Sequence, residues 1–304
     1  MAWSLRRLHI ETSTLCNADC AICPQASIQR PRKIDLPRVR RLLTEDALAY
    51  RDTLHLVEFH NYNEPLLMFD LFCELTELTH TTFGSHKVGL VSNGSIMDMD
   101  KADRLIDLRL AHVLFSVDGF SKEVYETHRA GLNRDEVYNN INLFLSRSAE
   151  KDGPVPLIIF TATPENAHEV DLVRAHFEGK RCRFYAHGCD GRGRDVAKIR
   201  AVRDAWSDIP CDYALDGAYV LSNLDVATCC EDWSGKEIMG NLAENTLQEI
   251  VDGVPYETFR SLHFSGRKRE SPLCTNCRTN MTYADSWKKE IPTTDLLAIR
   301  AVRG

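Results

Sequence analysis

The chain has 304 residues, of which 43% are hydrophobic and 27% charged, and its formal net charge at pH 7 is −7. These proportions are typical of a globular protein with a sizeable core, and the negative balance without a basic face disfavours a nucleic-acid partner. No run approaches the length of a membrane span and residues 1–7 lack an apolar signal core, so we expect a cytoplasmic protein whose 11 cysteines are metal ligands and buried thiols.

Strand-like and helix-like runs alternate along the first two thirds of the chain. The expected strands are 5–12, 54–60, 87–92, 111–117, 155–162 and 181–187. The expected helices are 36–50, 65–80, 98–107, 134–148 and 169–178. The strands are rich in Val, Ile, Leu and Phe, as parallel strands covered by helices are. The pattern predicts an α/β fold, with a partial (β/α)6 barrel in residues 1–200 and a small second domain in residues 201–304.

The first expected strand leads into a loop with the spacing C-x3-C-x2-C, formed by Cys16, Cys20 and Cys23. Three thiolates on a tight loop suit a four-iron cluster and leave one iron open, whereas a zinc site usually takes four ligands. An open iron on a reducible cluster can cleave S-adenosylmethionine (SAM) to a deoxyadenosyl radical. The loop resembles the cluster loop of the radical SAM superfamily, which places Ile22 near the adenine and implies a [4Fe–4S] cluster that binds SAM.

Polar residues follow the next expected strands, at the edge where such barrels carry their chemistry. The resemblance implies that SAM is bound by Asn63, Glu64, Ser92, Asn93, Ser116, Asp118 and Arg129. Asn63 stands where glycine is usual in the family, and Glu64 followed by proline is also typical of a helix N-terminus. The alternative for Asp118 is a helix cap. The alternative for Arg129 is an exposed helical side chain. The basic run 30–41 is interpreted as a linker and the solvated face of a helix.

Other side chains are candidates for contacts with a substrate. His9 and Glu11 are two residues apart and share one face of the first strand, where they are either a satisfied buried pair or substrate contacts. Tyr62 precedes the SAM-binding element after the second strand. Arg192 lies in a glycine-rich loop after the sixth strand, at the mouth of the expected barrel.

A second group of cysteines follows residue 205. Cys274 and Cys277 form a C-x2-C hook whose upstream partners are Cys211 and Cys229, and by spacing alone the site suits zinc or iron–sulfur. The order resembles the short, twitch-like form of the SPASM extension of radical SAM proteins, which implies one auxiliary [4Fe–4S] cluster with these four ligands. Cys230 is the alternative to Cys229. A cluster closed by four protein ligands suits electron transfer.

Across about residues 5–285 the chain resembles the twitch-type radical SAM alcohol dehydrogenases of aminoglycoside biosynthesis. The resemblance implies hydrogen abstraction from a hydroxyl-bearing carbon, transfer of an electron to the auxiliary cluster, and a ketone product. Only 15 residues precede Cys16, which leaves no room there for a leader-binding domain, so we expect a small polar substrate, an aminocyclitol or amino sugar. An electron donor such as flavodoxin or ferredoxin is implied. Arg194 resembles the arginine near the reacting hydroxyl, and Glu231 is a second candidate as acceptor or base.

Two alternatives belong to other functional classes. In an epimerase, a thiol such as Cys230 or Cys189 would return a hydrogen to the carbon radical from the opposite face. A non-catalytic iron–sulfur or zinc module that binds a partner would not need SAM-contact motifs at successive strand ends, so the sequence disfavours it.

Overall fold

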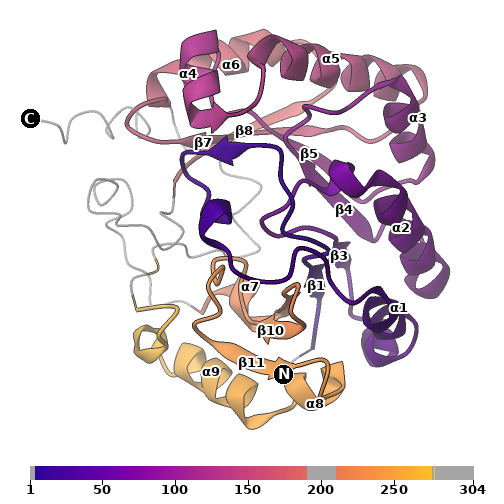
Figure 1. The fold of residues 1–304 in the computed structure, drawn as a ribbon, viewed down its shortest axis with the longest axis vertical. Helices are drawn as coiled ribbons and strands as arrows, with labels where there is room; N and C mark the ends of the chain where they lie inside the picture. Colours follow the sequence, from indigo (N-terminus) through magenta and orange to yellow (C-terminus); the bar gives the residue numbers. More distant parts are fainter. Residues whose placement is uncertain (1–3, 190–209, 276, 278–304) are drawn as a thin grey trace, which may run out of the picture.

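The computed structural model describes residues 4–189, 210–275 and 277 (Figure 1). Its main feature is one sheet with the strand order β11-β10-β9-β1-β3-β4-β5-β7-β8. The strands are β1 (Arg7–Ile10), β3 (Leu56–Glu58), β4 (Val88–Ser92), β5 (His112–Ser116), β7 (Leu157–Ala162), β8 (Arg183–Gly188), β9 (Gly217–Val220), β10 (Asp225–Ala227) and β11 (Ile238–Asn241). The expected residues Arg192 and Arg194 lie outside the described part of the chain, so their roles stay predictions.

The six strands expected from the sequence are neighbours in this sheet, and every pair from β1 to β8 is parallel. Their carboxyl ends therefore meet at one edge. This arrangement confirms the predicted α/β fold with a partial barrel. Two further short strands, β2 (Asp19–Cys20) and β6 (Arg129–Ala130), form a separate antiparallel pair that the sequence did not suggest.

Helices cover the outer side of the curved sheet, whereas the N-terminal segment after β1 crosses its inner side (Figure 1). The barrel helices are α1 (Leu36–Thr44), α2 (Phe69–Phe83), α3 (Met99–Asp107), α4 (Lys122–His128), α5 (Arg134–Glu150) and α6 (Val170–Phe177). Side chains of Asp98, Ser121 and Asn133 accept backbone N–H groups at the starts of α3, α4 and α5, which satisfies donors that a helix leaves unpaired.

The expected helix 36–50 is wrong in one respect, because it is interrupted. Glu45 leaves helical geometry, with φ −128° and ψ −67°, and a 3-10 turn follows at Asp46–Tyr50. That turn buries Ala47 and Tyr50. The expected helix 65–80 likewise begins as a 3-10 turn at Pro65–Met68 before α2 continues.

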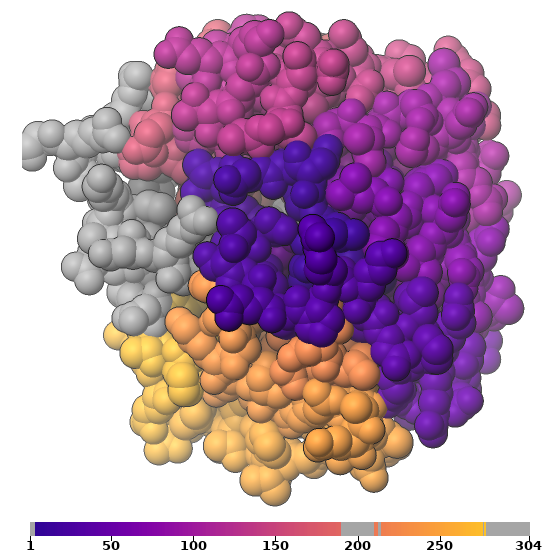
Figure 2. Space-filling model, viewed as in Figure 1, coloured from indigo at the N-terminus to yellow at the C-terminus, as the bar shows by residue number. Residues whose placement is uncertain are grey.

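The C-terminal part extends the same sheet. β9 pairs with β1 in parallel, and β10 and β11 add an antiparallel hairpin beyond it. Its helices are α7 (Asp212–Leu215), α8 (Leu247–Val251) and α9 (Val254–Phe264). On the face shown in Figure 2, the N-terminal segment lies between the barrel helices and this part. Residues on both sides of the expected domain boundary thus share one sheet, and the boundary itself stays a prediction.

Among the helices that the structure describes, none is both long enough and apolar enough to cross a bilayer.

Candidate active site

The cysteine loop is held at the carboxyl edge of the sheet by backbone pairing. Cys20 lies opposite Arg129 in the β2–β6 pair, and the Cys23 N–H donates to the Cys20 carbonyl at 2.9 Å. Cys16, Cys20 and Cys23 are all half-buried free thiols. Burial raises the pKa of Cys16 to about 11, so a bound metal has to drive its deprotonation. Three thiols on one tight loop fit three corners of an iron–sulfur cluster.

Arg129 is part of a buried ion pair beside this loop. Its guanidinium lies 2.6 Å from the Asp118 carboxylate, and Nη1 is 3.9 Å from the Cys20 sulfur. Burial alone would lower the pKa of Arg129, but Asp118 holds it above its usual range. Asp118 also accepts the Thr161 N–H at 2.8 Å, and the side chain that caps the following helix α4 is that of Ser121. Arg129 is likewise buried, which excludes an exposed helical arginine.

Glu64 connects two strand ends. One carboxylate oxygen accepts the Leu66 N–H at 3.1 Å and the Ser92 hydroxyl at 2.8 Å, and the other accepts the Asn93 N–H at 2.7 Å. Burial raises its pKa, although these hydrogen bonds oppose the shift. Asn93 in turn donates to the Asn17 side chain at 2.9 Å within the cysteine loop. Glu64 therefore caps a helix, as expected, and also joins the elements that the sequence assigned to SAM.

Three further residues assigned to SAM lie in the same region. Asn63 accepts the Asn61 N–H at 2.9 Å and so shapes the turn after β3. Ile22 in the cysteine loop and Ser116 at the end of β5 are half-buried. Their contacts with SAM stay predictions.

Glu11 is fully buried and is held by Arg30 in a two-pronged ion pair, with N–O distances of 2.8 and 3.0 Å. The Ser222 N–H also donates to it at 3.0 Å, and Arg30 donates to the Trp233 carbonyl. These contacts satisfy the charge of Glu11, and its role as a substrate contact stays a prediction. Arg30 lies in an irregular connection before α1, as the linker interpretation expects, but it is not a solvated residue, because its side chain is only 10% exposed. Residues distant in the sequence supply its partners.

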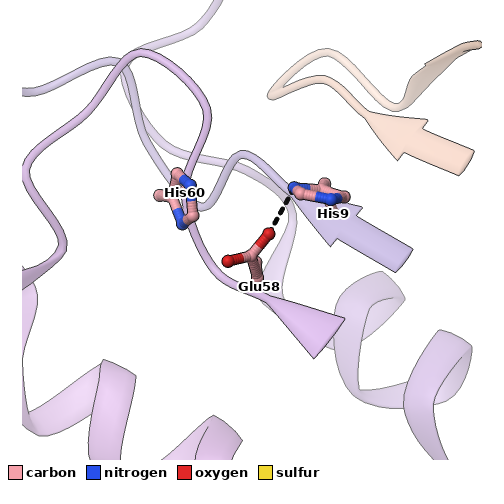
Figure 3. A group of neighbouring side chains, drawn as sticks. All are labelled: His9, Glu58 and His60. Carbon is pink, nitrogen blue, oxygen red and sulfur yellow. Dashed lines mark ion pairs between the residues drawn. The ribbon is translucent and has the colours of Figure 1, made fainter. Parts of the chain in front are cut away.

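His9 belongs to a polar cluster on the inner face of the sheet. Its Nδ1 lies 3.1 Å from a Glu58 oxygen, and Figure 3 shows His60 on the other side of that carboxylate. The second Glu58 oxygen contacts His112 Nε2 at 2.9 Å. The His9 ring stacks on Tyr219 with centroids 4.3 Å apart. Burial lowers the pKa of His9 to about 3, which favours the neutral imidazole.

Ligand atoms of His9, Glu58 and His60 lie within 4.8 Å of one another, close enough to be considered for a metal ion. Both Glu58 oxygens, however, already contact imidazole nitrogens. A hydrogen-bonded network accounts for the cluster without an ion. Gly89 makes this network possible, since a Cβ at that position would lie only 2.3 Å from His112 Nε2 and 2.9 Å from Glu58 Oε1.

The second set of cysteines lines one small cavity. Its lining includes the four expected ligands Cys211, Cys229, Cys274 and Cys277, together with Cys230, Glu231, His263 and Lys268. The Cys277 N–H donates to the Cys274 carbonyl at 3.2 Å, which forms the C-x2-C hook, and the Glu231 N–H donates to the Cys229 sulfur at 3.4 Å. Four cysteines around one cavity fit a cluster that is fully ligated by the protein.

Tyr62 joins this cavity to the barrel. Its hydroxyl donates to the backbone carbonyl of Cys230 at 2.6 Å. The sulfur of Cys230 lies 4.0 Å from a carboxylate oxygen of Glu231. Tyr62, one of the residues expected to meet substrate, thus contacts the second cysteine group.

A separate cavity of about 1360 Å³ lies at the opposite ends of β5, β7 and β8, lined by residues that include Arg109, Asp152 and Arg183. It opens near the amino ends of these strands and away from the cysteine loop. His112 lines this cavity and connects its wall to Glu58.

Sequence reasoning missed three residues that complete these sites. Glu58 and His112 lie within predicted strands, but only the register of the sheet shows that they meet. His263 lies on α9, which the sequence did not predict, and it contacts two of the expected cluster ligands. Its spacing from the cysteines gives no signal of that contact.

Comparison with known proteins places these features in a family. Residues 10–175 match the family model of the Radical SAM superfamily, and residues 211–278 match that of the SPASM iron–sulfur cluster-binding domain. A relative from Niallia circulans, named S-adenosyl-L-methionine-dependent 2-deoxy-scyllo-inosamine dehydrogenase, is 24% identical over 274 residues, covering 89% of this chain and 91% of the relative.

Solved structures show the same fold. BtrN in complex with AdoMet and 2-DOIA aligns with a TM-score of 0.66 at 20% identity, covering 93% of this chain and 98% of BtrN. Native anSMEcpe with bound AdoMet aligns with a TM-score of 0.68 at 17% identity, covering 98% of this chain and 97% of that chain. At these identities the likeness supports the architecture and carries no substrate assignment.

Proposed function

Because the chain belongs to the radical SAM superfamily, we propose that it is a dehydrogenase that oxidises a hydroxyl-bearing carbon of an aminocyclitol or amino sugar to a ketone. It is a radical SAM enzyme with a SPASM-type iron–sulfur domain. The observation that carries the proposal is the second cysteine cavity, which is enclosed by four expected ligands and connected to the barrel through Tyr62. A closed cluster at this position suits removal of an electron from a substrate radical.

The residues of the barrel edge would hold the first cluster and SAM. Cys16, Cys20 and Cys23 are the expected iron ligands, and the cluster with SAM supplies a radical that abstracts hydrogen. Glu64 is our candidate for the SAM amino group. Arg129, positioned by Asp118, is our candidate for the SAM carboxylate, since a guanidinium pairs well with a carboxylate. A flavodoxin or ferredoxin is the class of reductant we expect.

Oxidation of the substrate also requires loss of its hydroxyl proton. Glu231 is placed beside the second cysteine cavity and is a candidate acceptor for that proton. Arg194, which is outside the described residues, is suited to orient the hydroxyl and stabilise an alkoxide, because a guanidinium is a poor base. His9 and Tyr62 are the candidates that would contact the polar groups of the substrate.

The Niallia circulans relative is named as a dehydrogenase of 2-deoxy-scyllo-inosamine, which supports oxidation as the reaction. An antibiotic-biosynthesis context and a cytoplasmic location are part of the proposal. The epimerase alternative is not favoured by this relative. The two reactions differ in products: an epimerase retains the hydrogen count and takes one deuterium from deuterated water, whereas a dehydrogenase product has lost two hydrogens. Mass spectrometry of turnover in deuterated water with an accepted aminocyclitol distinguishes them.

Iron counting tests the electron acceptor directly. Anaerobically reconstituted protein is compared with a variant in which Cys16, Cys20 and Cys23 are all alanine. Two four-iron clusters predict about eight irons per chain in the parent and about four in the variant. About four in the parent and none in the variant would remove the auxiliary cluster and, with it, the proposed dehydrogenase mechanism.

A further inference from the structure

His263 lies between two of the expected auxiliary-cluster ligands. It is located in the last turn of α9, is fully buried, and packs against Phe259 with ring centroids 4.5 Å apart. Its Nδ1 is 3.3 Å from the backbone nitrogen of Cys211, and its Nε2 is 3.5 Å from the sulfur of Cys274. One imidazole therefore contacts two of the distant segments that form the cavity.

The two contacts determine which ring nitrogen carries the proton. The backbone N–H of Cys211 can only donate, so Nδ1 of His263 has to accept with its lone pair. In a neutral imidazole the proton is then on Nε2, which points at the Cys274 sulfur. This geometry makes His263 a hydrogen-bond donor to a sulfur that we expect to be a cluster ligand.

We propose that His263 is a positioning residue that raises the reduction potential of the auxiliary cluster by donating a hydrogen bond from Nε2 to the Cys274 thiolate. Hydrogen bonds to the sulfurs and the net charge around a cluster are among the properties that set its potential. Such a bond stabilises the more negative, reduced state. The inference rests on the proposed function, in which the auxiliary cluster takes the electron of the substrate radical.

Lys268 is also expected to raise the reduction potential of the auxiliary cluster. Its side chain is buried, with 6% exposure, and it lines the cavity together with His263 and the cysteines. A positive charge next to a cluster also favours the reduced state. A second donor, the N–H of Glu231, contacts the Cys229 sulfur at 3.4 Å. Two hydrogen-bond donors and one positive charge thus face the cysteines of the cavity, which the Glu231 carboxylate also lines.

The consequence for the reaction follows from its electron balance. After hydrogen abstraction, the substrate radical loses its hydroxyl proton to a base and one electron to the auxiliary cluster, and a ketone results. A higher reduction potential of that cluster makes the transfer of the electron from the substrate radical more favourable. For one electron, a tenfold change in the equilibrium constant corresponds to about 59 mV.

The test measures the potential by redox titration followed by EPR, in a holoprotein whose Cys16, Cys20 and Cys23 are alanine, so that only the auxiliary cluster contributes. His263→Phe keeps a ring of similar size but removes the donor, and His263→Gln restores an N–H. We expect the Phe variant to lower the potential by about 59 mV, a tenfold change in equilibrium constant, and the Gln variant to recover part of it. Lys268→Met is expected to lower it, and Lys268→Arg to retain it.

His176→Phe is the matched control, because His176 is a half-buried ring of α6 that contacts Phe120 and Tyr138 rather than the cysteines. It should leave the potential unchanged. An unchanged potential in His263→Phe, with iron content intact, overturns the inference while leaving the proposed function standing. Absence of iron from the triple-alanine parent overturns both.

If the His263→Phe variant loses its iron, its potential cannot be measured, and the test is made on the protein that retains His263. The protein is labelled with ¹⁵N-histidine, reduced, and measured by pulsed EPR. A weak coupling between the auxiliary cluster and a histidine nitrogen is expected, and it should disappear in His263→Gln. No histidine coupling overturns the inference, and a coupling strong enough for direct iron ligation overturns it as well.

Discussion

The hydroxyl of Tyr62 donates to the backbone carbonyl of Cys230 at 2.6 Å, across 168 residues of sequence. Tyr62 lies in the turn after β3, next to the elements expected to bind SAM. Cys230 follows an expected ligand of the auxiliary cluster. This contact therefore fixes the second cysteine loop against the barrel edge, where radical formation and electron acceptance would have to be coupled.

Replacing Tyr62 with phenylalanine should weaken that coupling. We expect the free energy of unfolding to fall by about 1 kcal/mol, the usual contribution of one hydrogen bond, and the yield of ketone per deoxyadenosine released to decrease. Denaturant titration and product analysis would measure both. Tyr50→Phe is the control, since the buried Tyr50 hydroxyl has no hydrogen-bond partner among the described residues. Equal effects of the two substitutions would contradict the coupling.

The ion pair between Glu11 and Arg30 should be a major source of stability. Glu11→Gln leaves a buried guanidinium without its charge partner, and breaking a buried pair by removing one member typically costs about 3–5 kcal/mol. Denaturation of protein with matched iron content would measure the loss. Arg40→Met, which breaks the exposed pair with Glu74, should cost no more than about 1 kcal/mol. A loss below about 1 kcal/mol for Glu11→Gln would contradict the ion pair as a major source of stability.

The arrangement of His9 and Glu58 predicts a dependence of stability on pH. Burial lowers the pKa of His9 from 6.5 to about 3. Burial acts to raise the pKa of Glu58, but the neighbouring imidazoles hold it below its usual range. For both groups the unfolded chain binds protons more readily than the folded one, so stability decreases as the pH falls from about 6.5 towards 3.

The expected slope from His9 is at most about 1.4 kcal/mol per pH unit within that window. His9→Gln removes the titrating ring but keeps polar atoms, so its stability should depend less steeply on pH than that of the parent. Denaturation at several pH values above and below 6, with equal iron content in both proteins, gives the comparison. Identical slopes would show that His9 binds a proton equally well when folded.

The strands and the cysteine groups could be predicted because their signals are local. β-branched and aromatic runs indicate strands within a few residues, and the spacing of Cys16, Cys20 and Cys23 reflects a single loop. The sheet confirms the partial barrel that these runs predicted. The same local logic found the C-x2-C hook.

The features of the site that the sequence did not predict depend on contacts between distant segments. Arg30 looked like a solvated linker residue, because nothing nearby in sequence shows that its loop returns to Glu11. His112 reaches Glu58 only because Gly89, between them in the sheet, has no side chain. The contacts of His263 depend on the packing of α9 against both cysteine segments. Such arrangements follow from register and packing, which no residue spacing encodes.

The pair of Asp118 and Arg129 gives the most direct test of SAM recognition. Asp118→Asn keeps the shape of the side chain but removes the charge that holds Arg129 2.6 Å away. We expect SAM to bind at least tenfold more weakly, because the guanidinium is no longer fixed beside the Cys20 sulfur. Equilibrium binding of SAM to the cluster-loaded protein would measure this change.

Asp103→Asn is the matched control, since Asp103 forms a partly exposed ion pair with Arg147 on the outer helices. It should leave SAM affinity unchanged and alter stability little, because exposed ion pairs are screened by solvent. Arg129→Lys separates two explanations. If Arg129 binds the SAM carboxylate through two parallel N–H groups, lysine will not restore affinity, because an ammonium cannot form that fork. Full SAM affinity in Arg129→Lys would mean that only a positive charge is needed beside the cluster loop. Unchanged SAM affinity in Asp118→Asn would show that the ion pair takes no part in SAM recognition.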